Sequence, residues 1–160
     1  MRANELVEAF DNPLQINWQS QSDKHWYGEF TVEALDYSIV FTKDPDYLFE
    51  GKPVSVWDLS FTLTENGFSG TSVIGTSSNH MKIFATVIQA IRVFLKAQNP
   101  EFIMINAYKE NQNRFKLYDR LAKVFAKELA GQGYQRIPKP AHKHHEELVS
   151  KYYDSIAFKR

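Results

Sequence analysis

A polar turn ahead of a long apolar segment carries the first residues whose types and spacing could do chemistry. The turn consists of Gly75, Thr76, Ser77, Ser78, Asn79 and His80. The segment Met81–Ala97 follows it and repeats its apolar residues at helical spacing. A turn that feeds a helix amino terminus offers unpaired backbone N–H groups and the positive end of the helix dipole, which together bind pyrophosphate. The alternative is that Ser77, Ser78 or Asn79 only caps the helix.

A tyrosine and an arginine on the segment Asn111–Leu129 form the second candidate site. Leucine, valine and phenylalanine residues recur there at helical spacing, which predicts a helix. Tyr118 keeps its proton at neutral pH and could act as a general acid, or it could pack its ring and hydrogen-bond at its tip. Arg114 could bind a phosphate bidentately, or it could pair with Glu110 four residues earlier on the same face.

A general base is harder to place, and Asp58 on the segment Val54–Thr64 is the first candidate. Strict alternation predicts a strand there. Its buried face is predicted to consist of Trp57, Leu59, Phe61 and Leu63. Its exposed face is predicted to include Asp58, Ser60 and Thr62. We therefore interpret Asp58 as a solvated strand acid, and Glu29 and Glu33 are no better placed.

Three histidines near the carboxy terminus raise the question of a metal site. His142, His144 and His145 precede Glu146 and Glu147, but they lack the helical His-Glu-x-x-His arrangement of zinc enzymes. We interpret them as a solvated tract that binds metal only adventitiously. Lysines and tyrosines in the same region could bind nucleic acid. The positive charge of the region is small, however, and nucleic acid is not expected as a partner.

The first half of the chain is predicted to be an antiparallel meander. The segments expected to form strands are Leu14–Trp18, His25–Glu33, Tyr37–Thr42 and Val54–Thr64, after a short helix over Asn4–Phe10. A bend is expected at Leu35-Asp36. Lys43–Pro53 is predicted to be a loop, because it contains two prolines, two aspartates and a glycine. Asn66-Gly67 predicts a tight hairpin turn into a strand over Phe68–Gly75.

The second half alternates helices and strands. Asn99-Pro100 is predicted to end the helix Met81–Ala97, since the residue before a proline is pushed out of the α region. A buried strand over Phe102–Ile105 and the helix Asn111–Leu129 follow. The last elements are a short helix over Glu146–Tyr153 and a strand over Ile156–Phe158. The fold class is α+β with a single mixed sheet, in which an antiparallel meander precedes strand-helix-strand-helix.

Composition bounds the class of protein. A chain of 160 residues predicts one domain. Nineteen basic residues balance nineteen acidic ones, so no overall field draws the protein to nucleic acid or an anionic membrane. The lack of cysteine excludes disulfides, thiolate metal sites and a cysteine nucleophile. No stretch approaches the ~18 apolar residues of a membrane span, and the amino terminus lacks a signal-peptide core. We expect a soluble, cytoplasmic protein.

Several short motifs between Thr71 and Tyr134 resemble one known family. They are Gly75-Thr76, Lys82-Ile83-Phe84-Ala85-Thr86-Val87, Pro100–Asn106, Arg114–Arg120 and Gly133-Tyr134. This part of the chain resembles the cofactor-binding half of the GNAT acyltransferases, and most of all the small GNAT-like proteins of bacteriophages. The resemblance divides the single domain into a strand meander (1–68), a cofactor-binding-like half (69–134) and a carboxy-terminal extension (135–160).

The resemblance implies a GNAT-like fold and an acyl-CoA-dependent N-acyltransferase that moves an acyl group to an amine. Acetyl-CoA would be held by Val73, Ile74, Gly75, Thr76, Ser77, Ser78, Asn79, His80, Asn111 and Arg114. Tyr118 would protonate the departing thiolate. The strand Thr71–Gly75 would lie beside Phe102–Asn106 and splay from it to admit the pantetheine arm.

This chain departs from the family pattern at two places. The family's phosphate turn reads Arg/Gln-x-x-Gly-x-Gly/Ala, of which only Gly75 remains, and a helix alanine is replaced by Arg114. The alternative function is therefore a non-catalytic binding or structural protein that reuses the fold, such as a virion component. An enzyme would act in the host cytoplasm on a small-molecule or protein amine. A structural protein would contact other phage proteins in the particle. Neither alternative involves a membrane.

Overall fold

The first half of the chain pairs as an antiparallel meander, as the sequence predicted. The computed structural model describes residues 14–32, 35–65, 68–69, 77–108 and 123–160. The meander consists of β1 (Asn17–Gln21), β2 (His25–Val32), β3 (Leu35–Phe49) and β4 (Lys52–Glu65). Each strand pairs antiparallel with the next. β5 (Phe68–Ser69) then returns along the end of β4, as expected of a hairpin.

The second half completes the same sheet. Its elements are α2 (Ser77–Gln98), β6 (Phe102–Tyr108), a helical stretch at 123–131, β7 (Gln135–Ile137), β8 (Ala141–His142), α4 (Glu146–Tyr152) and β9 (Tyr153–Lys159). The nine strands follow the order β1-β2-β3-β4-β6-β9-β7, with β5 on β4 and β8 on β3. Only β4 and β6 are parallel among the described pairs. The prediction of an α+β fold with a single mixed sheet is confirmed.

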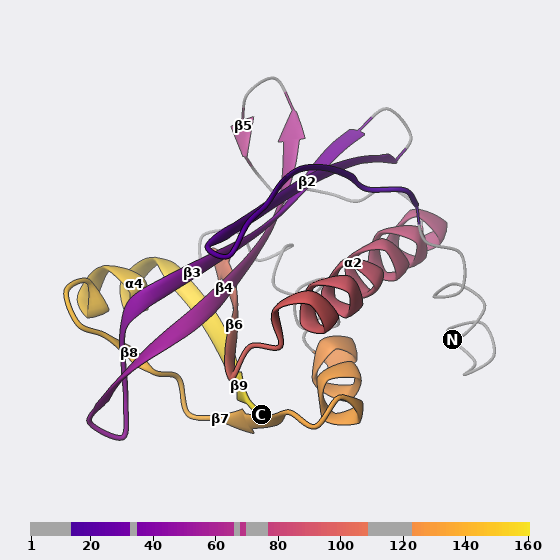
Figure 1. Cartoon of the computed structure of the whole chain (residues 1–160). Coiled ribbons are helices and arrows are strands. Elements are labelled where there is room, and N and C mark those ends of the chain that lie inside the picture. The colour runs from indigo at the N-terminus through magenta and orange to yellow at the C-terminus, as the bar shows by residue number, and fades with distance from the viewer. Residues whose placement is uncertain (1–13, 33–34, 66–67, 70–76, 109–122) are drawn as a thin grey trace.

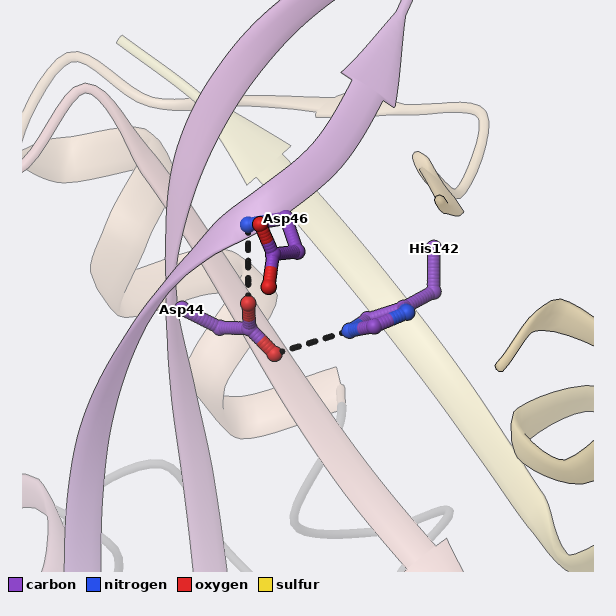
Figure 2. Close-up of side chains that lie close together, drawn as sticks. All are labelled: Asp44, Asp46 and His142. Atoms are coloured by element: carbon purple, nitrogen blue, oxygen red, sulfur yellow. Dashed lines mark hydrogen bonds and ion pairs between the residues drawn. The ribbon is translucent and has the colours of Figure 1, made fainter. Parts of the chain in front are cut away.

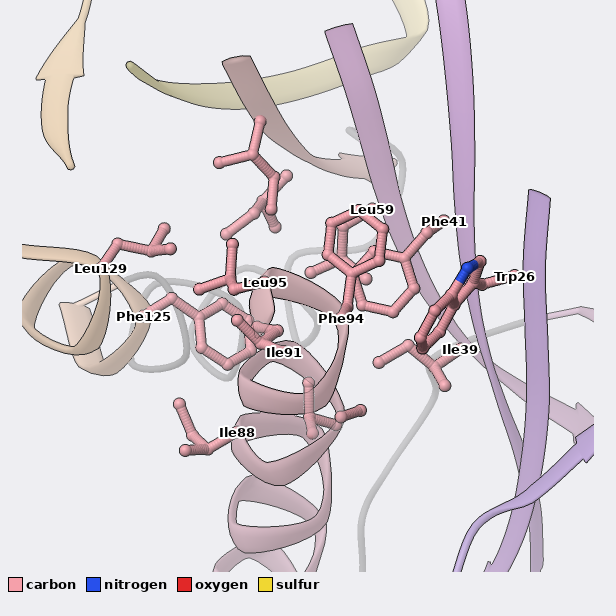
Figure 3. Packing of buried hydrophobic residues seen from close by; sticks show 14 of the residues in the cluster. Trp26, Ile39, Phe41, Leu59, Ile88, Ile91, Phe94, Leu95, Phe125 and Leu129 are labelled. Carbon is pink, nitrogen blue, oxygen red and sulfur yellow. The ribbon is translucent and has the colours of Figure 1, made fainter. Parts of the chain in front are cut away.

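The sheet carries helices on both faces (Figure 1). α2 and the helical stretch at 123–131 lie on one side, and α4 lies on the other. The larger core fills the α2 side, where aromatic rings of the meander meet apolar side chains of α2 (Figure 3). A smaller core on the α4 side consists of Tyr47, Val56, Phe102, Met104 and Ala157. Within the described residues, no helix is long and apolar enough to span a membrane.

α2 begins earlier than predicted and ends where predicted. It starts at Ser77, so Ser77–His80 form its first turn and not a turn ahead of it. At its other end Asn99 takes the left-handed conformation, with φ of 46°, and its N–H donates to the carbonyl of Leu95 at 2.8 Å. Asparagine tolerates this conformation better than most residues do, and Pro100 then prevents continuation. The local sequence Asn99-Pro100 therefore determines where α2 ends.

The predicted loop over Lys43–Pro53 is wrong. β3 continues to Phe49 and β4 starts at Lys52, so that most of the segment is hairpin. The register shifts between Asp44 and Tyr47, which accommodates Pro45, a residue with no N–H to donate to the ladder. The chain reverses at Glu50 and Gly51, both at positive φ, as a two-residue hairpin turn of the I′ kind requires.

Smaller differences concern other strand ends. β1 starts at Asn17, three residues after the predicted Leu14. Leu35 and Asp36 belong to β3 and pair with β2, so no bend lies there. α4 and β9 confirm the predicted last helix and strand. The predictions for Asn4–Phe10, Asn66-Gly67, 70–76 and 109–122 fall outside the described residues.

The faces of β4 are only partly as predicted. Trp57 and Leu59 are buried against α2, and Phe61 is half-buried. The opposite face was predicted to be exposed, but Val56 is fully buried there and Asp58 and Ser60 are half-buried. That prediction is wrong because the segment that includes β8 and α4 covers this face.

A glycine on β2 gives the first testable prediction. A Cβ added to Gly28 would lie 2.6 Å from Cγ2 of Ile16 and 2.8 Å from Cε3 of Trp18. Gly28→Ala is expected to lower the free energy of unfolding in urea by about 1–3 kcal/mol, the usual cost of overpacking. The control Gly131→Ala adds a methyl group with nothing within 4 Å on a helical residue. It should raise stability by roughly 0.5–1 kcal/mol. Equal stabilities of Gly28→Ala and wild type would contradict the close packing.

Candidate functional site

Polar side chains gather on the α4 side of the sheet, around Asp58. We call this group the polar cluster, and it consists of Asp44, Tyr47, Asp58, Asn106, His142 and Ser155. The residues come from β3, β4, β6, β8 and β9. Asp58, Asn106 and Ser155 alternate along their strands with side chains that pack in the larger core, so these three share the opposite face of the sheet. Five strands thus contribute side chains to the polar cluster.

Asp58 lies where the two parallel strands of the sheet part. β4 and β6 pair at Trp57↔Ile103, Asp58↔Met104 and Leu59↔Ile105, and no later pair is found among the described residues. Both strands continue beyond that point, to Glu65 and Tyr108. The Asp58 carboxylate is therefore one residue from the end of the shared ladder.

This arrangement bears on one expectation, although the first of its two strands lies outside the described residues. The strand Thr71–Gly75 was predicted to be the neighbour of Phe102–Asn106. Along Ile103–Ile105, however, β6 pairs with β4 on one edge and with β9 on the other, which leaves no edge for a third strand. The parting of two parallel strands is found instead between β4 and β6.

A chain of hydrogen bonds orients the Asp58 carboxylate. Nδ2 of Asn106, the first residue of β6 beyond the ladder, donates to Oδ1 of Asp58 at 3.0 Å. The Asn106 amide oxygen in turn accepts from the hydroxyl of Ser155. The Tyr47 hydroxyl lies 3.5 Å from both carboxylate oxygens, at the limit of a hydrogen bond. The carboxylate is therefore fixed from one side and approached by a hydroxyl from another.

The surroundings of Asp58 make it a group that titrates at neutral pH. Burial raises its pKa to about 7, and the negative charge of Asp44 acts in the same direction. The Asn106 hydrogen bond, the Tyr47 hydroxyl and His142 oppose the rise. Burial, followed by the charges of Asp58 and Asp44, also raises the pKa of Tyr47 far above its ordinary value, so its hydroxyl remains a donor. A carboxyl group with a pKa near the working pH is suited to accept and release protons.

His142 ties α4 to β3 through both ring nitrogens. Its Nδ1 accepts from the backbone N–H groups of His144 and His145, at 3.1 and 3.0 Å. Since these donors require an unprotonated Nδ1, the neutral ring carries its proton on Nε2, which lies 3.1 Å from Oδ2 of Asp44. The His142 N–H donates to Oε2 of Glu146 at 2.8 Å, which completes a reciprocal cap like a capping box.

The same residues include a group with the composition of a metal site. One ligand atom each of Asp44, Asp46 and His142 lies within 4.8 Å of the others (Figure 2). A histidine ligand needs a lone pair toward the metal, but here Nε2 carries the proton, and Nδ1 faces two N–H donors. Both Asp44 oxygens also accept hydrogen bonds already, from His142 and from the Asp46 N–H at 2.8 Å. The geometry is that of a hydrogen-bonded network and not of a metal centre.

The three histidines do not form the solvated tract that was predicted. His142 is buried against the Tyr47 ring, with 9% of its surface exposed, whereas His144 and His145 are exposed. No local pattern indicates this burial, because the partner of His142, Asp44, lies 98 residues earlier in the chain.

Most residues predicted to hold a cofactor lie outside the described residues. This applies to Val73, Ile74, Gly75, Thr76, Asn111, Arg114 and Tyr118. The backbone of Ser77–His80 is described, as the first turn of α2. Asp58 was named and set aside as solvated, and Asp44, Tyr47, Asn106 and Ser155 were missed. One signal was present: Val54 and Val56 share the face of Asp58, and two valines are unusual on a solvated face.

No protein-family model, curated protein or solved structure matches this chain.

Proposed function

We propose that the protein is an acyl-CoA-dependent N-acyltransferase of the GNAT-like type, with Asp58 as the general base. The observation that carries the proposal is the position of Asp58, a carboxyl group that titrates near pH 7 beside the point where β4 and β6 part. An amine is mostly protonated at neutral pH and cannot act as a nucleophile until a base removes a proton. Asp58 has the proton affinity for that task.

The start of α2 fits an acyl-CoA phosphate group. Its first turn, Ser77–His80, contains no acidic residue, so the positive end of the helix dipole is not neutralised there. α2 ends beside the start of β6 (Figure 1). By resemblance, Val73–Thr76, Asn111 and Arg114 would complete the site.

The chain's own groups account for the proton transfers. Asp58 in its ionised form accepts the proton of the substrate ammonium group, and the Asn106 hydrogen bond keeps the carboxylate turned for that transfer. Acyl-CoA, when bound, supplies the acyl group as a thioester whose C–S bond breaks as the amide C–N bond forms. Tyr118, the general acid that the resemblance implies, would give its proton to the leaving sulfur. The attacking nitrogen loses its second proton as the amide forms, and that proton would return to Tyr118 through solvent. Asp58 then returns its proton to solvent.

Binding and turnover of acetyl-CoA test the proposal directly. Calorimetry is expected to give saturable binding with a Kd below about 1 mM, equivalent to roughly 4 kcal/mol. Release of free coenzyme A thiol with a panel of primary amines should rise with pH and level off above about 7, as Asp58 ionises. Absence of saturable binding at that concentration would rule out the enzyme.

One observation favours the alternative, a non-catalytic binding or structural protein such as a phage particle component. Asp44, Asn106 and His142 already have hydrogen-bond partners within the chain, as residues of a purely structural network would. In that case acetyl-CoA should not bind, and replacing Asp58 should affect stability alone. The two functions therefore differ in a single binding measurement.

A further inference from the structure

We infer that His142 is a positioning residue, which holds the Asp44 carboxylate beside Tyr47 and Asp58 while it starts α4. The catalytic consequence rests on the proposed function, but the positioning itself does not. His142 is the one cluster residue of β8, and it reaches β3 from a segment 98 residues away.

Three contacts fasten the β8 segment to the irregular part of β3. β8 pairs with Tyr47 and Leu48 as a short strand. The Lys143 N–H donates to the Asp46 carbonyl at 2.7 Å, within the register shift between Asp44 and Tyr47. The Nε2–H of His142 then meets Oδ2 of Asp44. The shift in β3 thus exposes a carbonyl and a carboxylate to the segment that starts α4.

The direction of each hydrogen bond determines what His142 does. Its Nδ1 is occupied by two backbone donors, so the ring cannot rotate without breaking the start of α4. Its Nε2 therefore faces Asp44 as a hydrogen-bond donor. The Asp44 carboxylate is held at a fixed place, with its Oδ1 accepting from the Asp46 N–H.

The fixed charge of Asp44 matters for Asp58. Among the residues whose side chains are described, the titratable or charged groups around Asp58 and Tyr47 are Asp44 on β3, His142 on β8 and Glu146 on α4. The nearest groups on β6 and β9, Asn106 and Ser155, are neutral. If Asp44 were free to turn into solvent, its repulsion of the ionised Asp58 would weaken. His142 thereby acts on the proton affinity of Asp58 through Asp44.

Two substitutions separate the functions of the two ring nitrogens. In His142→Asn, the amide oxygen can replace Nδ1 as the acceptor for His144 and His145, but the side chain is too short to reach Asp44. In His142→Gln, the amide nitrogen can replace Nε2 as the donor to Asp44. Asp44→Asn removes the charge itself and serves as the reference.

NMR of the full-length protein provides readouts that need no substrate. The ¹⁵N spectrum of His142 should show an unprotonated Nδ1 and a protonated Nε2. The carboxyl ¹³C titration midpoint of Asp58 should fall in Asp44→Asn, fall less in His142→Asn, and stay near wild type in His142→Gln. A protonated Nδ1, or an unchanged midpoint in both Asp44→Asn and His142→Asn, would overturn the inference.

A double-mutant cycle in urea keeps the inference testable if one variant folds poorly. The coupling between His142→Asn and Asp44→Asn should change the unfolding equilibrium constant about 10- to 100-fold, as for a hydrogen bond to a charged group. Coupling below about 2-fold would contradict the positioning. If acyl transfer is found, His142→Asn should lower kcat more than it changes KM, and His142→Gln should restore kcat. A protein with the NMR signature and the coupling but no acyl transfer would refute the proposed function alone.

Discussion

Replacing Asp58 by asparagine is expected to slow acyl transfer strongly and, at the same time, to make the protein more stable above pH 7. The carboxyl group has a pKa of about 7 in the fold, against roughly 3.9 in an unfolded chain. The folded state therefore binds this proton more tightly than the unfolded state does. Ionising Asp58 costs folding free energy, and the stability lost accumulates as the pH rises from about 4 to about 7.

Asparagine has the shape of the protonated acid and never ionises. At pH 8 the Asp58→Asn variant should exceed wild type by about 2–4 kcal/mol in the free energy of urea unfolding, and the difference should shrink toward pH 4. Turnover should fall by about 10²–10⁴-fold, the usual contribution of a general base. A variant that is less stable at pH 8, or that keeps its turnover, would contradict the assignment.

Asp23→Asn is the matched control for this experiment. Asp23 lies exposed in the connection between β1 and β2, so the same change of charge occurs in solvent. It should alter neither turnover nor the dependence of stability on pH. A common response of both variants would point to the overall charge of the protein and not to the polar cluster.

Phe94→Ala should be the most destabilising substitution in the core of the α2 side. Phe94 is fully buried, and its ring stacks on Phe41 with centroids 4.0 Å apart. The Trp26 ring meets it edge-on with centroids 5.5 Å apart (Figure 3). The Trp57 ring also meets it edge-on, at 4.9 Å. Removing the ring leaves a cavity among three other aromatic side chains and should cost about 3–5 kcal/mol in denaturant unfolding.

Val93→Ala is the control for Phe94→Ala. Val93 is the preceding residue of α2 and is 37% exposed, so its removal opens no cavity. The control should change stability by less than about 0.5 kcal/mol, since alanine is also the better helix former. If Phe94→Ala cost under 1 kcal/mol, the packing of α2 against the meander would be wrong.

Local sequence patterns predicted the elements whose partners lie nearby in the chain. Alternation defined β2 and β4, and Asn99-Pro100 defined the end of α2. The segment Lys43–Pro53 was misjudged because prolines and glycines usually indicate loops, whereas here Pro45 lies at a register shift and Gly51 in the hairpin turn. Local composition does not distinguish these cases.

The polar cluster could not be predicted for a different reason. Whether Asp58 is solvated depends on what covers its face of the sheet, and the covering segment comes from the far end of the chain. β8 and α4 bring His142 and Glu146 to β3, and β9 brings Ser155 to Asn106. The alternation of β4 predicts that the strand has two different faces. It does not predict which distant segments of the chain cover each face.

The two halves of the polar cluster differ in the entropy needed to assemble them. Tyr47 and Asp58 are 11 residues apart across a hairpin, whereas Asp44 and His142 are 98 apart. Closing a loop costs about 0.6 kcal/mol more for each doubling of its length, so the second contact costs roughly 2 kcal/mol more than the first. The β3–β4 hairpin can therefore bring Tyr47 to Asp58 while the chain from β8 to α4 is still free. That segment is also the part the native protein can release first without unpairing the meander, which would leave the face of Asp58 open to solvent.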